Sequence, residues 1–177
     1  LDVLKVFYEA GARVIDSSPM YGAAERTTGD LVHQLGKRDQ TFFATKVWTS
    51  GRDKGIAQIE QSMRLLRTTR IDLLQIHNLV DWRTHASTLR RLKDEGAVRY
   101  IGITHYTVAA HDDLQSVLRA EQFDFAQFNY SLATREAEQR LLPFCREHNI
   151  GVLINRPFEE GALFTRVRGR KLPAYAA

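Results

Sequence analysis

Cysteine is almost absent from this chain, because Cys145 is the only one among 177 residues. A single cysteine excludes an intramolecular disulfide bond and a zinc site built from several cysteines. Cys145 lies close to Leu141, Leu142 and Phe144 in a helical pattern. We therefore expect its thiol to be buried and to pack as a small hydrophobic group.

Long hydrophobic runs are also missing. No apolar stretch approaches the roughly 20 residues needed to cross a bilayer, and the first residues favour an amphipathic helix over a signal peptide. The net charge of +4 suits an anionic cofactor or substrate, or is simply surface composition, and no nucleic-acid motif accompanies it. We therefore expect a cytoplasmic protein with no membrane or nucleic-acid partner. The oligomeric state stays open.

Linkers and low-complexity segments are absent as well. The chain is 44% hydrophobic and 26% charged, which is ordinary for a globular protein. Its length suits one domain with a sizeable core. We therefore expect residues 1–177 to form a single domain.

Helical and strand-like patterns alternate along the whole chain. The predicted strands lie around 14–15, 41–46, 71–77, 100–103, 125–128 and 151–154. The predicted helices lie around 1–10, 23–35, 56–66, 84–94, 114–118 and 135–148. No further helix is predicted after Gly161.

The predicted strands are nearly continuous in apolar residues, which is typical of parallel sheets covered by helices. Right-handed crossovers then give an α/β fold with about six parallel strands. A closed (β/α)₈ barrel typically needs about 250 residues, so the pattern fits a barrel of this type without its first and last strands. Periodicity alone does not separate it from an open doubly wound sheet. Two sheet edges would be exposed or covered by something else, so we expect the chain to be a fragment.

Four polar residues lie where three of these strands give way to loops. Asp16 ends the first strand, and Tyr21 follows it in the next loop. Lys46 ends the second strand and His77 the third. Because all strands of a parallel α/β protein end at one face, these side chains are expected to converge there, where ligands bind.

The four groups suit the reduction of a carbonyl compound. Hydride addition turns a carbonyl into an alkoxide, which needs a proton as it forms. Tyr21 is a candidate donor, but a phenol with a pKa near 10 is a weak acid. A neighbouring ammonium would lower that pKa, and Lys46 is placed to supply it. Asp16 would then hold Lys46 charged, and His77 would polarise the carbonyl oxygen.

The order of these residues resembles the catalytic tetrad of the aldo-keto reductases. The resemblance runs from about Gly11 to Phe164 and is carried by four segments in the same order. These are Asp16-Ser17-Ser18 with Tyr21-Gly22-Ala23-Ala24-Glu25, then Ala44-Thr45-Lys46-Val47-Trp48, then Asp72-Leu73-Leu74-Gln75-Ile76-His77, and Ile101-Gly102-Ile103.

This resemblance implies a reductase with a (β/α)₈ TIM barrel, a small carbonyl substrate and no metal. The implied cofactor is NADP (as NADPH), with NAD as a second possibility. Tyr21 would be the proton donor, supported by Lys46, Asp16 and His77. Substrate identity is not implied, because it depends on loops that are short or missing here.

The resemblance also implies residues that hold the cofactor. A Ser-Asn pair after the family's fifth strand matches Thr104 and His105, and a glutamine on its sixth strand matches Gln127. The His105 ring replaces an asparagine amide but can still donate one hydrogen bond. After the seventh strand Asn155 stands where an aromatic ring often stacks on the nicotinamide, and Arg156 is a candidate ligand for a phosphate.

Met20 and Trp48 flank the proposed centre and are candidates for the wall of a substrate pocket, although simple loop packing would also explain them.

Three other functions stay open. The first is a metal-dependent hydrolase with Asp16, His77 and His105 as ligands, which lacks the usual additional His-x-His or carboxylate pair. The second is a non-catalytic protein that binds a cofactor, or a regulatory protein, on the same scaffold. The third is an inert fragment that associates through its sheet edges.

Overall fold

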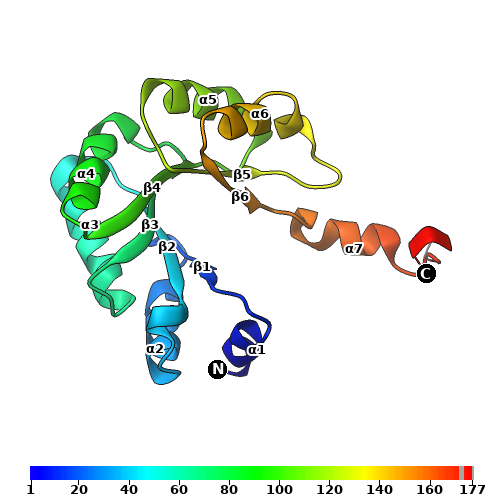
Figure 1. The fold of residues 1–177 in the computed structure, drawn as a ribbon, viewed down its shortest axis with the longest axis horizontal. Helices are drawn as coiled ribbons and strands as arrows, with labels where there is room; N and C mark the ends of the chain where they lie inside the picture. The colour runs from blue at the N-terminus through cyan, green and yellow to red at the C-terminus, as the bar shows by residue number, and fades with distance from the viewer. Residues whose placement is uncertain (172–173, 177) are drawn as a thin grey trace.

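The computed structural model describes residues 1–171 and 174–176. Within them six parallel strands form one sheet in the order β1-β2-β3-β4-β5-β6, so each strand pairs with the next one along the chain. The sheet curls, and helices α2 to α6 cover its outer side (Figure 1). This curled sheet is half of a barrel wall, which confirms the predicted α/β architecture.

The strands are β1 (Val14–Asp16), β2 (Phe42–Val47), β3 (Ile71–His77), β4 (Val98–Thr104), β5 (Phe125–Asn129) and β6 (Gly151–Asn155). The α-helices are α1 (Asp2–Glu9), α2 (Ala24–Gln34), α3 (Arg52–Leu65), α4 (Trp82–Asp94), α5 (His111–Ala120), α6 (Leu141–Glu147) and α7 (Ala162–Val167). Short 3₁₀ helices are η1 (Arg38–Gln40), η2 (Val108–Ala110), η3 (Glu136–Glu138), η4 (Glu159–Gly161) and η5 (Ala174–Ala176). The described residues contain no helix long and apolar enough to cross a membrane.

Two predictions about the C-terminal third were wrong. The single helix predicted over 135–148 is divided into η3 and the shorter α6. Pro143 lies in the first turn of α6, where its missing N–H costs nothing, whereas a helix already running from residue 135 would clash with its ring. The second error is α7, which follows Gly161 where no helix was predicted and extends away from the sheet (Figure 1).

Side chains alternate between the two faces of each strand. In β2, Phe43 is buried with Val32 and Leu66 of the helical layer. Lys46 has the other parity and therefore lies on the inner, concave face. The same alternation in β3 buries Leu74 and Ile76 in the main core and leaves neighbouring positions to the concave face. The outer face of the strands thus packs against the helices to form the hydrophobic core, and the concave face carries the polar side chains at the carboxyl ends of the strands.

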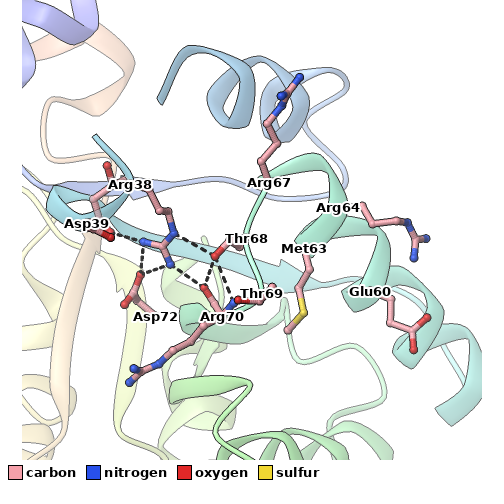
Figure 2. Close-up of a pocket in the computed structure, with 11 residues that line it drawn as sticks. Arg38, Asp39, Glu60, Met63, Arg64, Arg67, Thr68, Thr69, Arg70 and Asp72 are labelled. Carbon is pink, nitrogen blue, oxygen red and sulfur yellow. Dashed lines mark hydrogen bonds and ion pairs between the residues drawn. The ribbon is translucent and has the colours of Figure 1, made fainter. Parts of the chain in front are cut away.

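The amino-terminal ends of β2 and β3 border a cavity of about 930 Å³, which lies between them and the end of α3. Its lining is rich in charged side chains (Figure 2). Among them Arg67 is paired with Asp30. This cavity is at the opposite end of the strands from Tyr21, Lys46 and His77, and in parallel α/β folds that end serves stability rather than chemistry.

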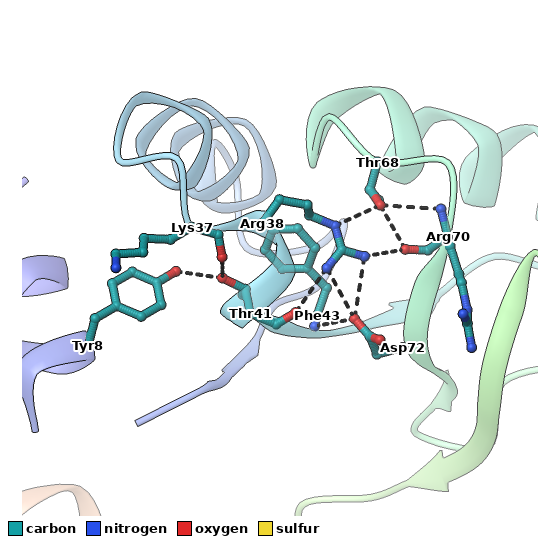
Figure 3. Close-up of polar contacts among 8 residues, drawn as sticks. All are labelled: Tyr8, Lys37, Arg38, Thr41, Phe43, Thr68, Arg70 and Asp72. Carbon is teal, nitrogen blue, oxygen red and sulfur yellow. Dashed lines mark hydrogen bonds and ion pairs between the residues drawn. The ribbon is translucent and has the colours of Figure 1, made fainter. Parts of the chain in front are cut away.

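Arg38 forms a network of hydrogen bonds that links the beginnings of β2 and β3 (Figure 3). Its guanidinium donates to Thr68 Oγ1 at 3.0 Å, to the Thr41 carbonyl at 2.9 Å and to the Arg70 carbonyl at 2.7 Å. It also lies 3.5 Å from Asp72 Oδ2. These partners come from the residue before β2, from the loop after α3 and from the start of β3, so one side chain fixes how β2 and β3 begin.

Candidate active site

Lys46 and Asp16 form an ion pair at the carboxyl ends of β2 and β1. Lys46 Nζ donates to Asp16 Oδ1 and Oδ2, both at 2.8 Å, and to the Ser17 carbonyl at 2.7 Å. The Lys46 side chain is only 2% exposed, so burial lowers its pKa, and the charge of Asp16 opposes that shift. A buried lysine without such partners would be costly, so the pair explains how Lys46 is tolerated.

Two amide side chains extend this pair along the concave face. Gln127 Nε2 donates to Asp16 Oδ2 at 3.0 Å, and Gln75 Nε2 donates to Gln127 Oε1 at 2.9 Å. Both glutamines are buried, and the strand register places Gln75 beside Lys46. The sequence analysis named Gln127 but missed Gln75, whose signal was an amide between the apolar residues Leu74 and Ile76 of β3.

Tyr21 lies close to this pair in the loop after β1, and its side chain is about half exposed. Lys46 Nζ is 5.3 Å from the centre of its ring. Burial, and then the charge of Asp16, raise the pKa of Tyr21 above its usual value of 10. The net shift is therefore opposite to the lowering that was predicted from Lys46, because burial and the charge of Asp16 outweigh it.

His77 ends β3, and its ring meets the Tyr21 ring edge-on, with 6.0 Å between the ring centres. The side chain is buried, and His77 Nδ1 is 3.1 Å from Ser18 Oγ. Burial, and then the charge of Lys46, lower the pKa of His77 to about 4. The imidazole is therefore neutral at pH 7 and can donate a hydrogen bond from one nitrogen only.

A cavity of about 410 Å³ opens at these strand ends. It is lined by Met20, Tyr21, Lys46, His77, Asn78, Thr104, Tyr106, Asn155 and Arg156. Three of the tetrad residues and four of the other predicted site residues thus share one cavity. The strand register explains part of this, because His77 is paired with Thr104 in the sheet.

Four predicted residues lie outside the lining of this cavity. One of them is Asp16, which pairs with Lys46 as described above. The Trp48 ring is 6.4 Å from the His77 ring, centre to centre, and is 42% exposed. The side-chain amide of Gln127 donates its hydrogen bond to Asp16, as described above. His105 Nδ1 accepts hydrogen bonds from the backbone of Tyr106 at 3.0 Å and of Thr107 at 3.3 Å, which leaves its Nε2 as the donor.

Two lining residues were missed by the sequence analysis. Asn78 follows His77 directly, has a left-handed φ of 52°, and its Oδ1 is buried without a hydrogen-bond partner. Tyr106 packs its ring against the Arg156 guanidinium, 5.0 Å away. Asn78 was detectable as a polar residue next to a strand-end histidine, whereas nothing in the sequence marked Tyr106.

In the part of the chain that the structure describes, no three His, Cys, Asp or Glu side chains are grouped to hold a metal ion. The carboxylate of Asp16 is engaged by Lys46 and Gln127 instead. The structure therefore offers the metal-hydrolase alternative no ligand set around Asp16, His77 and His105.

Comparisons with known proteins identify the family of the chain. The model of the aldo/keto reductase family matches residues 1–174. Aldo-keto reductase YhdN of Bacillus subtilis is 28% identical over 169 residues, which cover 87% of this chain and 50% of that protein. The NADH-specific methylglyoxal reductase of Escherichia coli is 25% identical over 195 residues, which cover 92% of this chain and 57% of that protein.

A solved structure gives the same result in three dimensions. The aldo-keto reductase from Klebsiella pneumoniae in complex with NADPH superposes with a TM-score of 0.79 at 25% identity. The match covers 95% of this chain and 60% of that one. This chain therefore spans little more than half the length of the relatives it matches. From the family match over nearly all of its residues, the chain belongs to the aldo/keto reductase family.

Proposed function

We propose that this chain carries the site at which an NAD(P)H-dependent reductase converts an aldehyde or ketone to an alcohol. The observation that carries the proposal is the buried Lys46–Asp16 pair next to Tyr21, with a neutral His77 in the same cavity. A buried ion pair beside a phenol is an arrangement suited to proton donation.

In the proposed reaction Tyr21 is the acid. Its raised pKa keeps the phenol protonated at neutral pH. As hydride reaches the carbonyl carbon, the phenol proton passes to the carbonyl oxygen and leaves a phenolate. The ammonium of Lys46 stabilises that phenolate, and neutral His77 donates a hydrogen bond to the oxygen while its charge develops.

The cavity wall fits a nicotinamide cofactor, which when bound supplies the hydride. Thr104 and Asn155 bring a hydroxyl and an amide, and Arg156 brings a cation suited to a phosphate. The unpartnered Oδ1 of Asn78 is a further acceptor in the same wall. Both NADPH and NADH are proposed, because the Klebsiella protein was solved with NADPH and the E. coli relative is NADH-specific.

Cofactor binding and turnover are tested separately. We expect titration with NADPH or NADH to quench protein fluorescence, because Trp48 lies beside His77. We expect Tyr21→Phe to remove oxidation of NAD(P)H by methylglyoxal and by a panel of other aldehydes and ketones. The variant should keep its cofactor affinity.

Tyr175→Phe is the matched control, because Tyr175 is 92% exposed and loses the same hydroxyl group. Undiminished turnover in Tyr21→Phe would refute the role of the phenol. Cofactor binding without turnover in the unaltered chain would instead favour a non-catalytic binding protein.

A further inference from the structure

We propose that Ser18 is a positioning residue, whose hydroxyl donates to His77 Nδ1 and so keeps the imidazole hydrogen on Nε2. The inference deepens the proposed function, because Nε2–H is the group that would donate to a carbonyl oxygen. Ser18 lies in the loop between β1 and Tyr21, and His77 ends β3, so the contact joins two segments 59 residues apart.

The surroundings of Ser18 limit where its hydrogen can go. Ser18 is completely buried. Among the described residues its Oγ has two hydrogen-bond contacts, one with His77 Nδ1 at 3.1 Å and one with the backbone N–H of Met20 at 3.3 Å. The Met20 N–H can only donate, so that contact uses one lone pair of the hydroxyl oxygen.

The single hydrogen of the hydroxyl therefore has one acceptor within reach, which is the lone pair of His77 Nδ1. If Nδ1 carried the imidazole hydrogen instead, Ser18 Oγ would accept two hydrogen bonds and its own hydrogen would be buried without a partner. A buried unsatisfied donor costs free energy, so the Nε2–H tautomer is favoured. The low pKa of His77 is consistent with this assignment, because only a neutral imidazole exists as two tautomers, with its hydrogen on Nδ1 or on Nε2.

Two other histidines provide reference signals for the two tautomers. His85 Nε2 is 2.7 Å from the Thr49 carbonyl, so its hydrogen is on Nε2. His148 Nδ1 is 2.9 Å from the Phe144 carbonyl, so its hydrogen is on Nδ1. A carbonyl oxygen can only accept, which fixes both assignments.

The test is nitrogen NMR of the ¹⁵N-histidine-labelled chain at pH 7.5. We expect the His77 Nδ1 signal to match the unprotonated Nδ1 of His85. A His77 Nδ1 signal like the protonated Nδ1 of His148 would overturn the proposal, and this measurement needs no variant.

Ser18→Ala tests the cause. We expect its His77 nitrogen signals to shift toward a mixture of the two tautomers, and an unchanged spectrum would show that Ser18 does not set the tautomer. Ser17→Ala is the matched control for this readout, because Ser17 directly precedes Ser18 and its Oγ is buried without a hydrogen-bond partner. It should leave the His77 signals unchanged.

Turnover gives a second readout. We expect Ser18→Ala to lower kcat about tenfold while leaving NADPH affinity unchanged, because the substrate oxygen loses a fixed donor. An unchanged kcat would contradict the positioning role. If the unaltered chain shows no turnover, the proposed function fails, but the NMR signals still decide the role of Ser18.

Discussion

Lys46 Nζ lies 2.8 Å from each carboxylate oxygen of Asp16, yet the two side chains differ in burial, at 2% and 27% exposed. The ammonium of Lys46 is buried inside the half-barrel, whereas the carboxylate of Asp16 is partly exposed to solvent. The two halves of the pair therefore do not depend on each other equally. Removing the carboxylate leaves the buried charge of Lys46 without a partner. Removing the ammonium leaves the charge of Asp16, which is partly exposed to water.

This asymmetry predicts the effects of two substitutions. We expect Asp16→Asn to lower the free energy of unfolding toward the roughly 3–5 kcal/mol seen when one partner of a buried pair is lost. Lys46→Met should cost less, because water and Gln127 still solvate Asp16. Urea unfolding of both variants and of the double variant measures the difference. A larger loss for Lys46→Met would contradict the stated burial.

Stability should fall on acidification because His77 is neutral in the folded chain. Its pKa is lowered to about 4, whereas an unfolded histidine binds a proton near pH 6.5. Between these values the unfolded state holds more protons, so the free energy of unfolding falls as pH drops from about 6.5 to 4, by up to about 3 kcal/mol. His105, whose pKa burial also lowers, adds an effect of the same sign.

Urea unfolding at several pH values checks this. We expect His77→Asn to flatten the dependence between pH 6.5 and 4. The exposed His33 provides the control, and His33→Asn should leave the slope as it is. A slope that survives in His77→Asn would assign the effect to other groups.

Cys145 should be inert in the folded chain. It is fully buried, as the sequence predicted, and burial raises the pKa of its thiol to about 11. Because the thiolate is the reactive form, we expect a disulfide reagent at pH 8 to modify Cys145 in urea but not in buffer. Rapid, complete modification of the native chain would contradict this burial.

Arg38 should matter more for stability than other arginines around the larger cavity. We expect Arg38→Met to lower the free energy of unfolding by roughly 2 kcal/mol, because it removes charge-assisted hydrogen bonds that join β2 to β3. Arg64→Met is the control, since Arg64 is exposed on the same cavity wall and should change stability by less than about 0.5 kcal/mol. Equal losses in both variants would show that the network in Figure 3 contributes little.

Much of the architecture was predictable because its signals are local. The apolar runs of the strands and the helical spacing between them depend on neighbouring residues, and they predicted six parallel strands that alternate with helices. The order of the strands in the sheet comes from the structure. The single helix predicted over 135–148 was wrong for a local reason too, because Pro143 favours a helix that begins close to it.

The sequence by itself determined that Asp16, Lys46 and His77 lie at or next to the ends of successive strands, and parallel strands must bring such ends to one face. Only the tertiary structure decided which partners each group has there. Gln127 reaches Asp16 across 111 residues, and this contact depends on strand register and curl. The ion pair, the raised pKa of Tyr21 and the contact of Ser18 with His77 depend likewise on burial and on partners distant in the chain, because desolvation and hydrogen bonding act between neighbours in space.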